Sequence, residues 1–160
     1  MSQGSKVNKG EDMNLSKNVK VDQVLGYFAA AQTTRKTDII DMAGYEGLML
    51  IFEFGTLLAT GTIACDINGN STNATGGTKL AGGATHTVTA TTAALTHSAI
   101  VVDIYQPDPT TYRYLEGMIT LGVANTLILG VTAIRYNGKV KPELTTGLLA
   151  SSFAASPAAA

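Results

Sequence analysis

Short apolar runs separated by turn residues dominate the middle of the chain. The clearest run is residues 47–54, Gly-Leu-Met-Leu-Ile-Phe-Glu-Phe. It begins with Gly47 and is followed by Gly55. A run of eight that is bounded by glycines and contains aromatic residues is too short for a typical buried helix. It is typical of a strand buried on both faces. The pattern therefore predicts a strand at the centre of a sheet.

Further strands are predicted at intervals along the same part of the chain. They are rich in β-branched or aromatic residues: 38–42, 57–67, 100–105, 112–121 and 126–136. Asn68-Gly69-Asn70 and Asn137-Gly138 are turn signals. Strands at this spacing, without convincing helices between them, predict an all-β fold, an antiparallel β-sandwich or jelly roll.

Two segments follow this pattern less well. Residues 21–32 place apolar side chains at a spacing compatible with a short helix capped by Asp22, although an extended segment with two aromatic anchors fits nearly as well. Residues 73–96 are rich in Gly, Ala and Thr and have few large apolar side chains. We interpret them as a long surface excursion, within which residues 85–89 have the composition of a strand.

The two ends of the sequence differ from its middle. Residues 1–20 are polar with scattered lysines and predict a flexible arm, whereas residues 145–160 are a low-complexity Ala/Ser-rich tail. The domain is therefore expected over residues 21–144. The arm has no apolar core of a signal peptide, and no apolar stretch approaches the roughly 20 residues that span a bilayer. We expect synthesis in the cytoplasm and no membrane partner.

The composition is poor in charge. Charged residues make up 14% of the chain and apolar residues 45%, with a formal net charge of −1, whereas an average globular protein has about 25% charged residues. Such a surface is either covered by a partner or polar through Thr, Ser, Asn and Gly. No basic patch follows residue 20, which argues against nucleic acid as a partner.

Side chains capable of chemistry are few. Cys65 is the single cysteine, which excludes an internal disulfide, and its apolar surroundings predict a buried core residue. His86 and His97 have no acidic residue near them; solvated loop histidines are the expected reading, and a pH-sensitive contact between subunits is the alternative. The sequence from Asp66 to Asn70 lacks the spacing of a calcium loop and is better explained as a turn. We therefore expect no enzyme activity, no metal and no cofactor.

Two stretches resemble small structural proteins of tailed bacteriophages. The first is residues 37–47, Thr-Asp-Ile-Ile-Asp-Met-Ala-Gly-Tyr-Glu-Gly; the second is residues 100–107, Ile-Val-Val-Asp-Ile-Tyr-Gln-Pro, followed by Tyr-Arg-Tyr-Leu at 112–115. The resemblance extends over about residues 35–142. It implies a capsid decoration (cement) protein with a jelly-roll or β-sandwich core. Such proteins sit as trimers on the outside of the head, across junctions between hexamers of the major capsid protein.

The resemblance and the residue pattern together give candidate interface positions. Arg113 suits an ion pair or a cation–π contact at a subunit seam, with an ordinary surface arginine as the alternative. Lysines of the arm suit an acidic capsid surface, and a solvated arm fits equally well. The candidate positions are Tyr45, Glu46, Gly47, Arg113, Tyr114, Lys17 and Lys20.

The resemblance thus implies a structural protein of the virion, located on the capsid surface. Its expected partners are the major capsid protein and further copies of itself in a homotrimer. The main alternative is a carbohydrate-binding or host-adhesion β-sandwich of a phage particle, against which the absence of Trp counts. A hydrolase on a sandwich scaffold is a third hypothesis, disfavoured by the lack of catalytic motifs.

Overall fold

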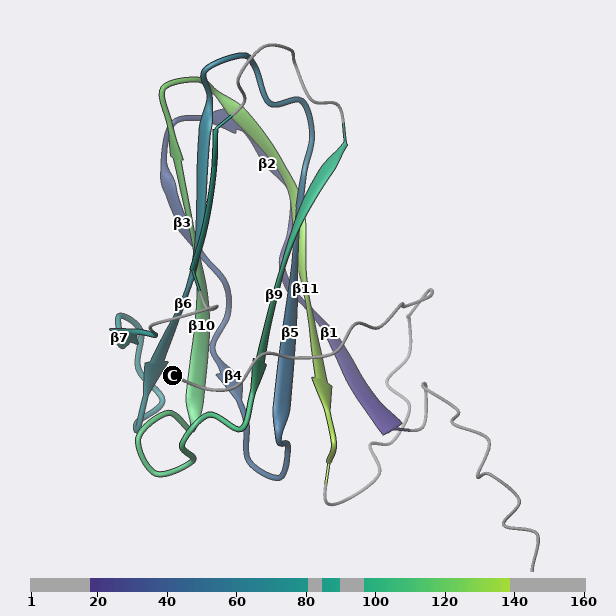
Figure 1. Cartoon of the computed structure of the whole chain (residues 1–160), viewed down its shortest axis with the longest axis vertical. Helices are drawn as coiled ribbons and strands as arrows, with labels where there is room; N and C mark the ends of the chain where they lie inside the picture. Colours follow the sequence, from purple (N-terminus) through teal and green to yellow (C-terminus); the bar gives the residue numbers. More distant parts are fainter. Residues whose placement is uncertain (1–17, 81–84, 90–96, 139–160) are drawn as a thin grey trace, which may run out of the picture.

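The computed structural model describes residues 18–80, 85–89 and 97–138. Three side chains of the second range are outside this description: Thr85, His86 and Val88. The described chain forms eleven strands in two antiparallel sheets that pack face to face (Figure 1). The predicted all-β sandwich is confirmed.

The first sheet has the strand order β1-β11-β5-β9, and β2 continues the pairing with β11 beyond β1. Its strands are β1 (Val19–Leu25), β2 (Phe28–Ala31), β5 (Gly47–Phe54), β9 (Ser98–Tyr105) and β11 (Thr126–Tyr136). The predicted central strand at 47–54 has the bounds of β5, which pairs with β11 on one side and β9 on the other. Its even-numbered residues enter the core, whereas Glu53 on the other face is exposed.

The second sheet has β10 and β6 at its centre. Its strands are β3 (Thr34–Lys36), β4 (Ile40–Asp41), β6 (Thr62–Asn70), β7 (Thr78–Lys79), β8 (Thr85–Thr89) and β10 (Tyr114–Gly122). Strands β3 and β4 pair with one edge of β10 in succession, and β7 and β8 pair with one edge of β6. The predicted strand at 85–89 is thus confirmed as β8.

The chain passes from one sheet to the other at most connections. The successive strands β4, β5 and β6 lie in the second, first and second sheet, and β9, β10 and β11 lie in the first, second and first. Three edges of the sheets are formed by two successive strands each: β1 with β2, β3 with β4, and β7 with β8. When each of these is counted as one strand, the orders β1-β11-β5-β9 and β3-β10-β6-β8 are those of a jelly roll.

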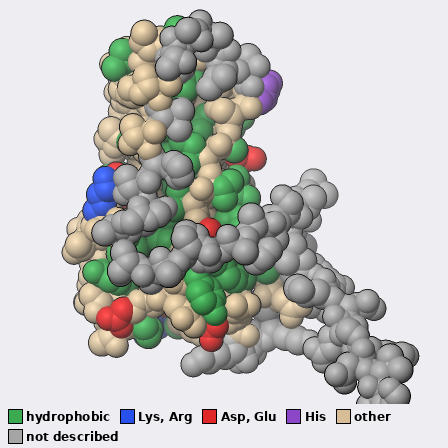
Figure 2. Space-filling model, in the orientation of Figure 1, with side chains coloured by type: hydrophobic (Ala, Val, Ile, Leu, Met, Phe, Trp, Pro, Cys, Tyr) green, Lys and Arg blue, Asp and Glu red, His purple; other side chains and the backbone are tan. Residues whose placement is uncertain are grey.

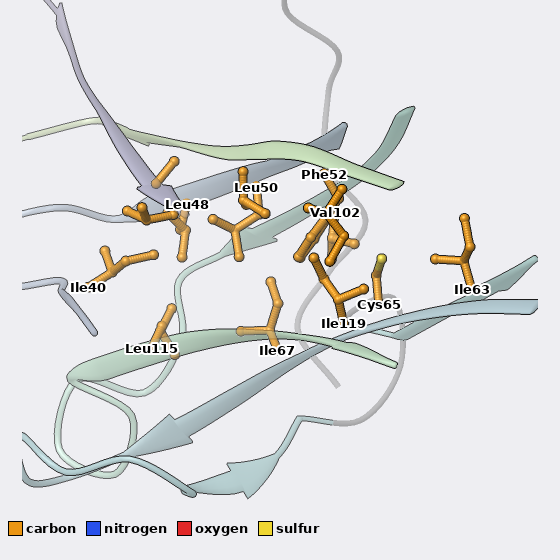
Figure 3. Packing of buried hydrophobic residues seen from close by; sticks show 14 of the residues in the cluster. Ile40, Leu48, Leu50, Phe52, Ile63, Cys65, Ile67, Val102, Leu115 and Ile119 are labelled. Carbon is orange, nitrogen blue, oxygen red and sulfur yellow. The ribbon is translucent and has the colours of Figure 1, made fainter. Parts of the chain in front are cut away.

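The core fills the space between the sheets. Figure 3 shows Leu48, Leu50 and Phe52 of the first sheet facing Ile67 and Ile119 of the second. All five side chains are fully buried. Complete burial of a side chain of this size contributes roughly 1.5–3 kcal/mol relative to exposure, so the inward-facing positions of both sheets hold the fold together.

The predicted helix over residues 21–32 is wrong, and the extended alternative is observed. Val21 and Val24 share a helix face because they are three residues apart, but in β1 they point to opposite faces of the sheet. Val24 enters the core and Val21 packs on the outer face. Pairing with β11 along the length of β1 outweighs the local helical spacing.

The turn predicted at Asn68-Gly69-Asn70 is also wrong. These residues end β6 and pair with the start of β10. Gly69 is needed there because a Cβ would lie 2.6 Å from the ring of Tyr112. The strand predicted from residue 57 begins at Thr62, because Thr60 has a positive φ of 67° and Gly61 donates a hydrogen bond back to Leu58.

One end of the sandwich gathers several connections. Strands β4 and β9 end there, β5 and β10 begin there, and both ends of the described main body, Asn18 and Gly138, adjoin it (Figure 1, lower end). Residues 42–46 and 106–113 form its two neighbouring loops. The connection over residues 55–61 lies at the opposite end.

Candidate interface at one end of the sandwich

Two loops from distant parts of the sequence are tied together at this end. The amide of Met42 donates a hydrogen bond to the carbonyl of Arg113 (2.9 Å), and the amide of Gln106 donates to the carbonyl of Glu46 (2.6 Å). Residues 42–46 belong to the first stretch of the family resemblance, and residues 106–107 and 112–113, the two ends of the second loop, belong to the second. The fold therefore joins the two stretches in one surface, which we call the end face.

An ion pair connects the two loops. The guanidinium of Arg113 donates from Nε to Asp41 Oδ1 (3.0 Å) and from Nη2 to Asp41 Oδ2 (2.9 Å). These bonds hold the pKa of Asp41 below its usual range. The same guanidinium lies 5.0 Å from the ring centre of Tyr114. Both charged side chains are nearly half exposed, so the pair orients the loops more than it stabilises the fold.

A second arginine lies beneath the loops. Arg135 of β11 donates hydrogen bonds to the carbonyl of Asp41 (2.6 Å) and to the carboxylate of Asp22. Its guanidinium lies 5.0 Å from the ring centre of Tyr45. The side chain is only 11% exposed. Arg135 therefore fixes the first loop and Tyr45 to the first sheet.

Two tyrosines flank the entry to β5. Tyr136 and Tyr105 are the cross-strand neighbours of Gly47, and their parallel rings are 6.3 Å apart. A Cβ on Gly47 would lie 2.0 Å from the Tyr136 ring, so this position requires glycine. Tyr136 Oη donates to Asp103 Oδ1 (2.6 Å), while burial raises the pKa of Asp103.

The end face is hollowed between the loops. A pocket of about 420 Å³ opens there. Its lining combines apolar and aromatic side chains with a few polar ones: Met42, Ala43, Gly44, Tyr45, Glu46, Gln106, Pro107, Pro109, Tyr112 and Arg113. A concave site of this kind suits an inserted side chain or a small polar ligand.

The second loop has its own internal support. Asp108 Oδ1 accepts a hydrogen bond from the amide of Thr110 (2.9 Å), and Oδ2 accepts one from the hydroxyl of Thr111 (2.7 Å). The amide of Tyr112 donates to the carbonyl of Asp108 (2.7 Å). These bonds give the loop with Pro107 and Pro109 a defined shape.

Most of the candidate interface positions lie at this end, with different surroundings. Tyr45, Glu46 and Arg113 line the pocket, whereas Gly47 is buried and Tyr114 stacks under Arg113. Lys20 lies within β1, with Nζ 3.9 Å from Asp22 Oδ1. Lys17 and the predicted tail over residues 145–160 lie outside the described residues.

Two contributors to the end face were missed by sequence reasoning. Asp41 falls within the predicted strand 38–42 and was given no role, and Arg135 was not singled out. The position of Arg135 was the signal that could have identified it. The predicted strand 126–136 has no other charged residue. A charge at such a position usually has a specific partner.

The chemistry of the remaining candidates is limited. Cys65 is buried in the core, and burial raises the pKa of its thiol. His97 is exposed with a positive φ of 55°. Within the described ranges, no three His, Cys, Asp or Glu side chains are grouped so that they could hold a metal ion. The part of the chain with assigned structure also contains no helix that is long and apolar enough to cross a bilayer.

A separate polar cluster lies on the outer face of the second sheet. Asn68 and Glu116 are cross-strand neighbours and both are buried. Glu116 Oε2 accepts a hydrogen bond from the amide of Gly76 (3.1 Å) and lies 3.4 Å from Lys36 Nζ. Lys79 Nζ lies 2.9 Å from Asp66 Oδ1. The opposite charges balance, and the cluster holds the connection over residues 71–77 against the sheet.

Comparison with known proteins does not assign the chain to a family. No protein-family model matches the sequence, and no curated protein matches it. The structure is similar to a chain in the structure of infectious bursal disease virus, Gt strain, with 14% sequence identity and a TM-score of 0.42. The match covers 76% of this chain and 32% of that chain, so this protein spans about a third of its length. A similarity at this level does not extend to function.

Proposed function

We propose that this protein is a non-enzymatic structural component of a tailed-phage virion that binds the outside of the head. In this proposal it bridges subunits of the major capsid protein as a homotrimer, and the end face is its contact surface. The observation that carries the proposal is the convergence of the two stretches with the family resemblance, 37–47 and 100–107 with 112–115, on one pocket.

The construction of the end face supports a contact role. Hydrogen bonds and the Asp41–Arg113 ion pair hold both loops in place before any partner arrives, so little conformational entropy is lost on binding. The pocket offers a socket for an anchor side chain, with Tyr45 and Arg113 at its lining. Tyr and Arg are enriched among residues that dominate binding energy.

The surface composition agrees with such a role. On the described part of the face shown in Figure 2, hydrophobic side chains are frequent and charged side chains are scattered. A protein that covers many equivalent sites on a shell needs only modest affinity at each, because several linked contacts bind together. A homotrimer would supply three end faces for this purpose.

A pocket-filling substitution tests the role of the end face. Ala43 lines the pocket and is exposed in a turn, so Ala43→Trp should fill the pocket without disturbing the core. The matched control is Ala59→Trp, an exposed alanine in a turn at the opposite end. We expect Ala43→Trp to weaken co-sedimentation with expanded heads of the encoding phage at least tenfold, and Ala59→Trp to leave it unchanged. Equal binding by both variants would exclude the end face as the contact.

A carbohydrate-binding or host-adhesion module is the second candidate. The pocket supports it, because Tyr45 and Tyr112 lie beside Glu46, Gln106 and Arg113, a combination of ring faces and hydrogen-bonding groups that suits a sugar. The absence of Trp counts against it. Glycan-array binding that Ala43→Trp abolishes, with no binding to phage heads, would favour this candidate.

A further inference from the structure

The pocket of the end face holds one charge that no ion pair balances. Two charged side chains are among its described lining residues, Glu46 and Arg113. The charge of Arg113 is balanced by Asp41, which accepts hydrogen bonds from both Nε and Nη2 of the guanidinium. None of the ion pairs in the described part of the chain includes Glu46. The Glu46 carboxylate therefore gives the pocket its net negative charge.

The Glu46 carboxylate is held in place by neutral groups. Its Oε2 accepts a hydrogen bond from the Tyr105 hydroxyl (3.4 Å), which itself accepts one from Nε2 of Gln106 (3.3 Å). The backbone amide of Glu46 donates to the carbonyl of Tyr136 (3.2 Å), and its carbonyl accepts from the amide of Gln106 (2.6 Å). One long hydrogen bond from a hydroxyl uses little of the capacity of a carboxylate to accept hydrogen bonds. Most of that capacity is left for a ligand.

The backbone of Gln106 shows that the pocket is shaped before a ligand enters. Gln106 has a positive φ of 51°, which residues other than glycine adopt infrequently. The hydrogen bond from its amide to the Glu46 carbonyl holds this conformation. Such conformations persist where the surrounding structure fixes them, and they cluster at ligand-binding sites.

The larger side chains of the lining favour a cation over an anion. Apart from Gln106 and the charged residues, they are apolar or aromatic: Met42, Tyr45, Pro107, Pro109 and Tyr112. The faces of aromatic rings attract cations, and the stems of lysine and arginine pack on apolar surfaces while the charged end meets a carboxylate. An anion at Arg113 would compete with Asp41 for the guanidinium and would be repelled by Glu46.

We propose that the end-face pocket takes a lysine or arginine side chain of the binding partner. The charged end of that side chain lies at the Glu46 carboxylate, and its stem packs against Tyr45 and Tyr112. The inference rests on the proposed function for the source of the side chain, a cationic residue exposed on the major capsid protein. The preference of the pocket for a cation is a property of this chain alone.

Two small probes added to the full chain test this preference by NMR. Nα-acetyl-lysine methylamide and Nα-acetyl-norleucine methylamide have similar aliphatic stems, but only the lysine probe is charged. We expect the lysine probe to shift the amide resonances of Ala43 and Gly44 and to bind at least roughly threefold more tightly than the norleucine probe. Equal affinities, or no binding of the lysine probe, would overturn the proposal.

A matched pair of variants identifies the group responsible. Glu46→Gln removes the charge and keeps the shape and an acceptor for the Tyr105 hydroxyl, so it should abolish the preference for the lysine probe. The control is Glu53→Gln, at an exposed glutamate near the other end of β5, and it should leave the preference unchanged. A preference that Glu46→Gln retains would contradict the proposal.

Co-sedimentation with expanded heads separates this inference from the proposed function. We expect Glu46→Gln to weaken binding to heads at least roughly threefold. If Ala43→Trp weakens this binding and Glu46→Gln leaves it unchanged, the cationic anchor is wrong and the proposed function stands. If the unsubstituted protein prefers the lysine probe and does not bind heads, the proposed function is wrong and the preference of the pocket stands.

Discussion

At the scale of single residues, the end face depends on a glycine that the sequence marks only as the boundary of a strand. Gly47 lies under the Tyr136 ring, and the aromatic side chain covers the space that a Cβ would take. Overpacking of this kind costs roughly 1–3 kcal/mol. We expect Gly47→Ala to lower the free energy of unfolding by about that amount in urea titrations. Gly26→Ala, where nothing lies within 4 Å of the added carbon, is the control and should cost much less.

The two arginines of the end face should differ in their contribution to stability. Arg135 is nearly buried and satisfies Asp22 and the Asp41 carbonyl, whereas Arg113 is half exposed. Removal of one partner from a buried pair costs far more than removal from an exposed one. We expect Arg135→Leu to lower the unfolding free energy by about 2–3 kcal/mol and Arg113→Leu to lower it clearly less. Equal losses would show that burial is not the deciding factor.

The Asp41–Arg113 pair also predicts a dependence on pH. The pKa of Asp41 is lowered in the folded protein, mainly by hydrogen bonds from Arg113. The stability that it contributes is therefore complete above the pKa of an unfolded aspartate and is lost as the pH falls through the lowered value. We expect Asp41→Asn to reduce the acid-induced loss of stability as the pH falls below the usual pKa of an aspartate, by a modest amount because solvent screens the exposed pair. An unchanged slope in acid denaturation would exclude this pair as its source.

The sequence predicted candidate residues only where a motif or a conspicuous pattern marked them. Tyr45, Glu46 and Arg113 belong to the stretches with the family resemblance, and all three line the pocket. Arg135 donates a hydrogen bond to the carbonyl of Asp41, and these two residues are 94 positions apart in the sequence. Such a contact arises from the alignment of β11 with β4 across the two sheets, which no local pattern encodes.

At the scale of elements, the strands with strong apolar patterns were predictable and the short or interrupted ones were not. The run 47–54 matches β5 and 126–136 matches β11, because each is apolar enough to specify a buried strand locally. Asn68-Gly69-Asn70 was read as a turn because its composition favours one. In the structure, pairing with β10, the Tyr112 ring over Gly69 and the burial of Asn68 beside Glu116 keep it in β6.

The connection between β6 and β7 should depend on one carboxylate. Glu116 Oε2 accepts the amide hydrogen of Gly76, and Gly77 lies so close to the Gly69 carbonyl that a Cβ would be 2.2 Å from its oxygen. We expect Glu116→Leu to accelerate hydrogen exchange at Gly76 at least tenfold. Glu116→Gln keeps an acceptor and should retain most of the protection. Equal exchange rates at Gly76 in both variants would show that the Glu116 carboxylate does not hold this connection in place.

At the scale of the whole molecule, the fold explains how so few charges are compatible with a stable domain. The apolar residues fill the space between two sheets and a second cluster on the outer face of one of them. Strand alternation and spacing predicted the sandwich, whereas the order of the strands, which makes it a jelly roll, depends on long-range pairing. The same order brings residues 42–46 and 106–113 to one end.

In the proposed function, this jelly roll decorates the outside of a phage head and contacts it through the end face. Cryo-electron microscopy of expanded heads of the encoding phage, with and without added protein, tests it most directly. We predict additional density on the outer surface that fits the sandwich, in groups of three, with the loops at 42–46 and 106–113 against the major capsid protein. Heads without added density, or density that contacts the shell through the end formed by residues 55–61, would contradict the account.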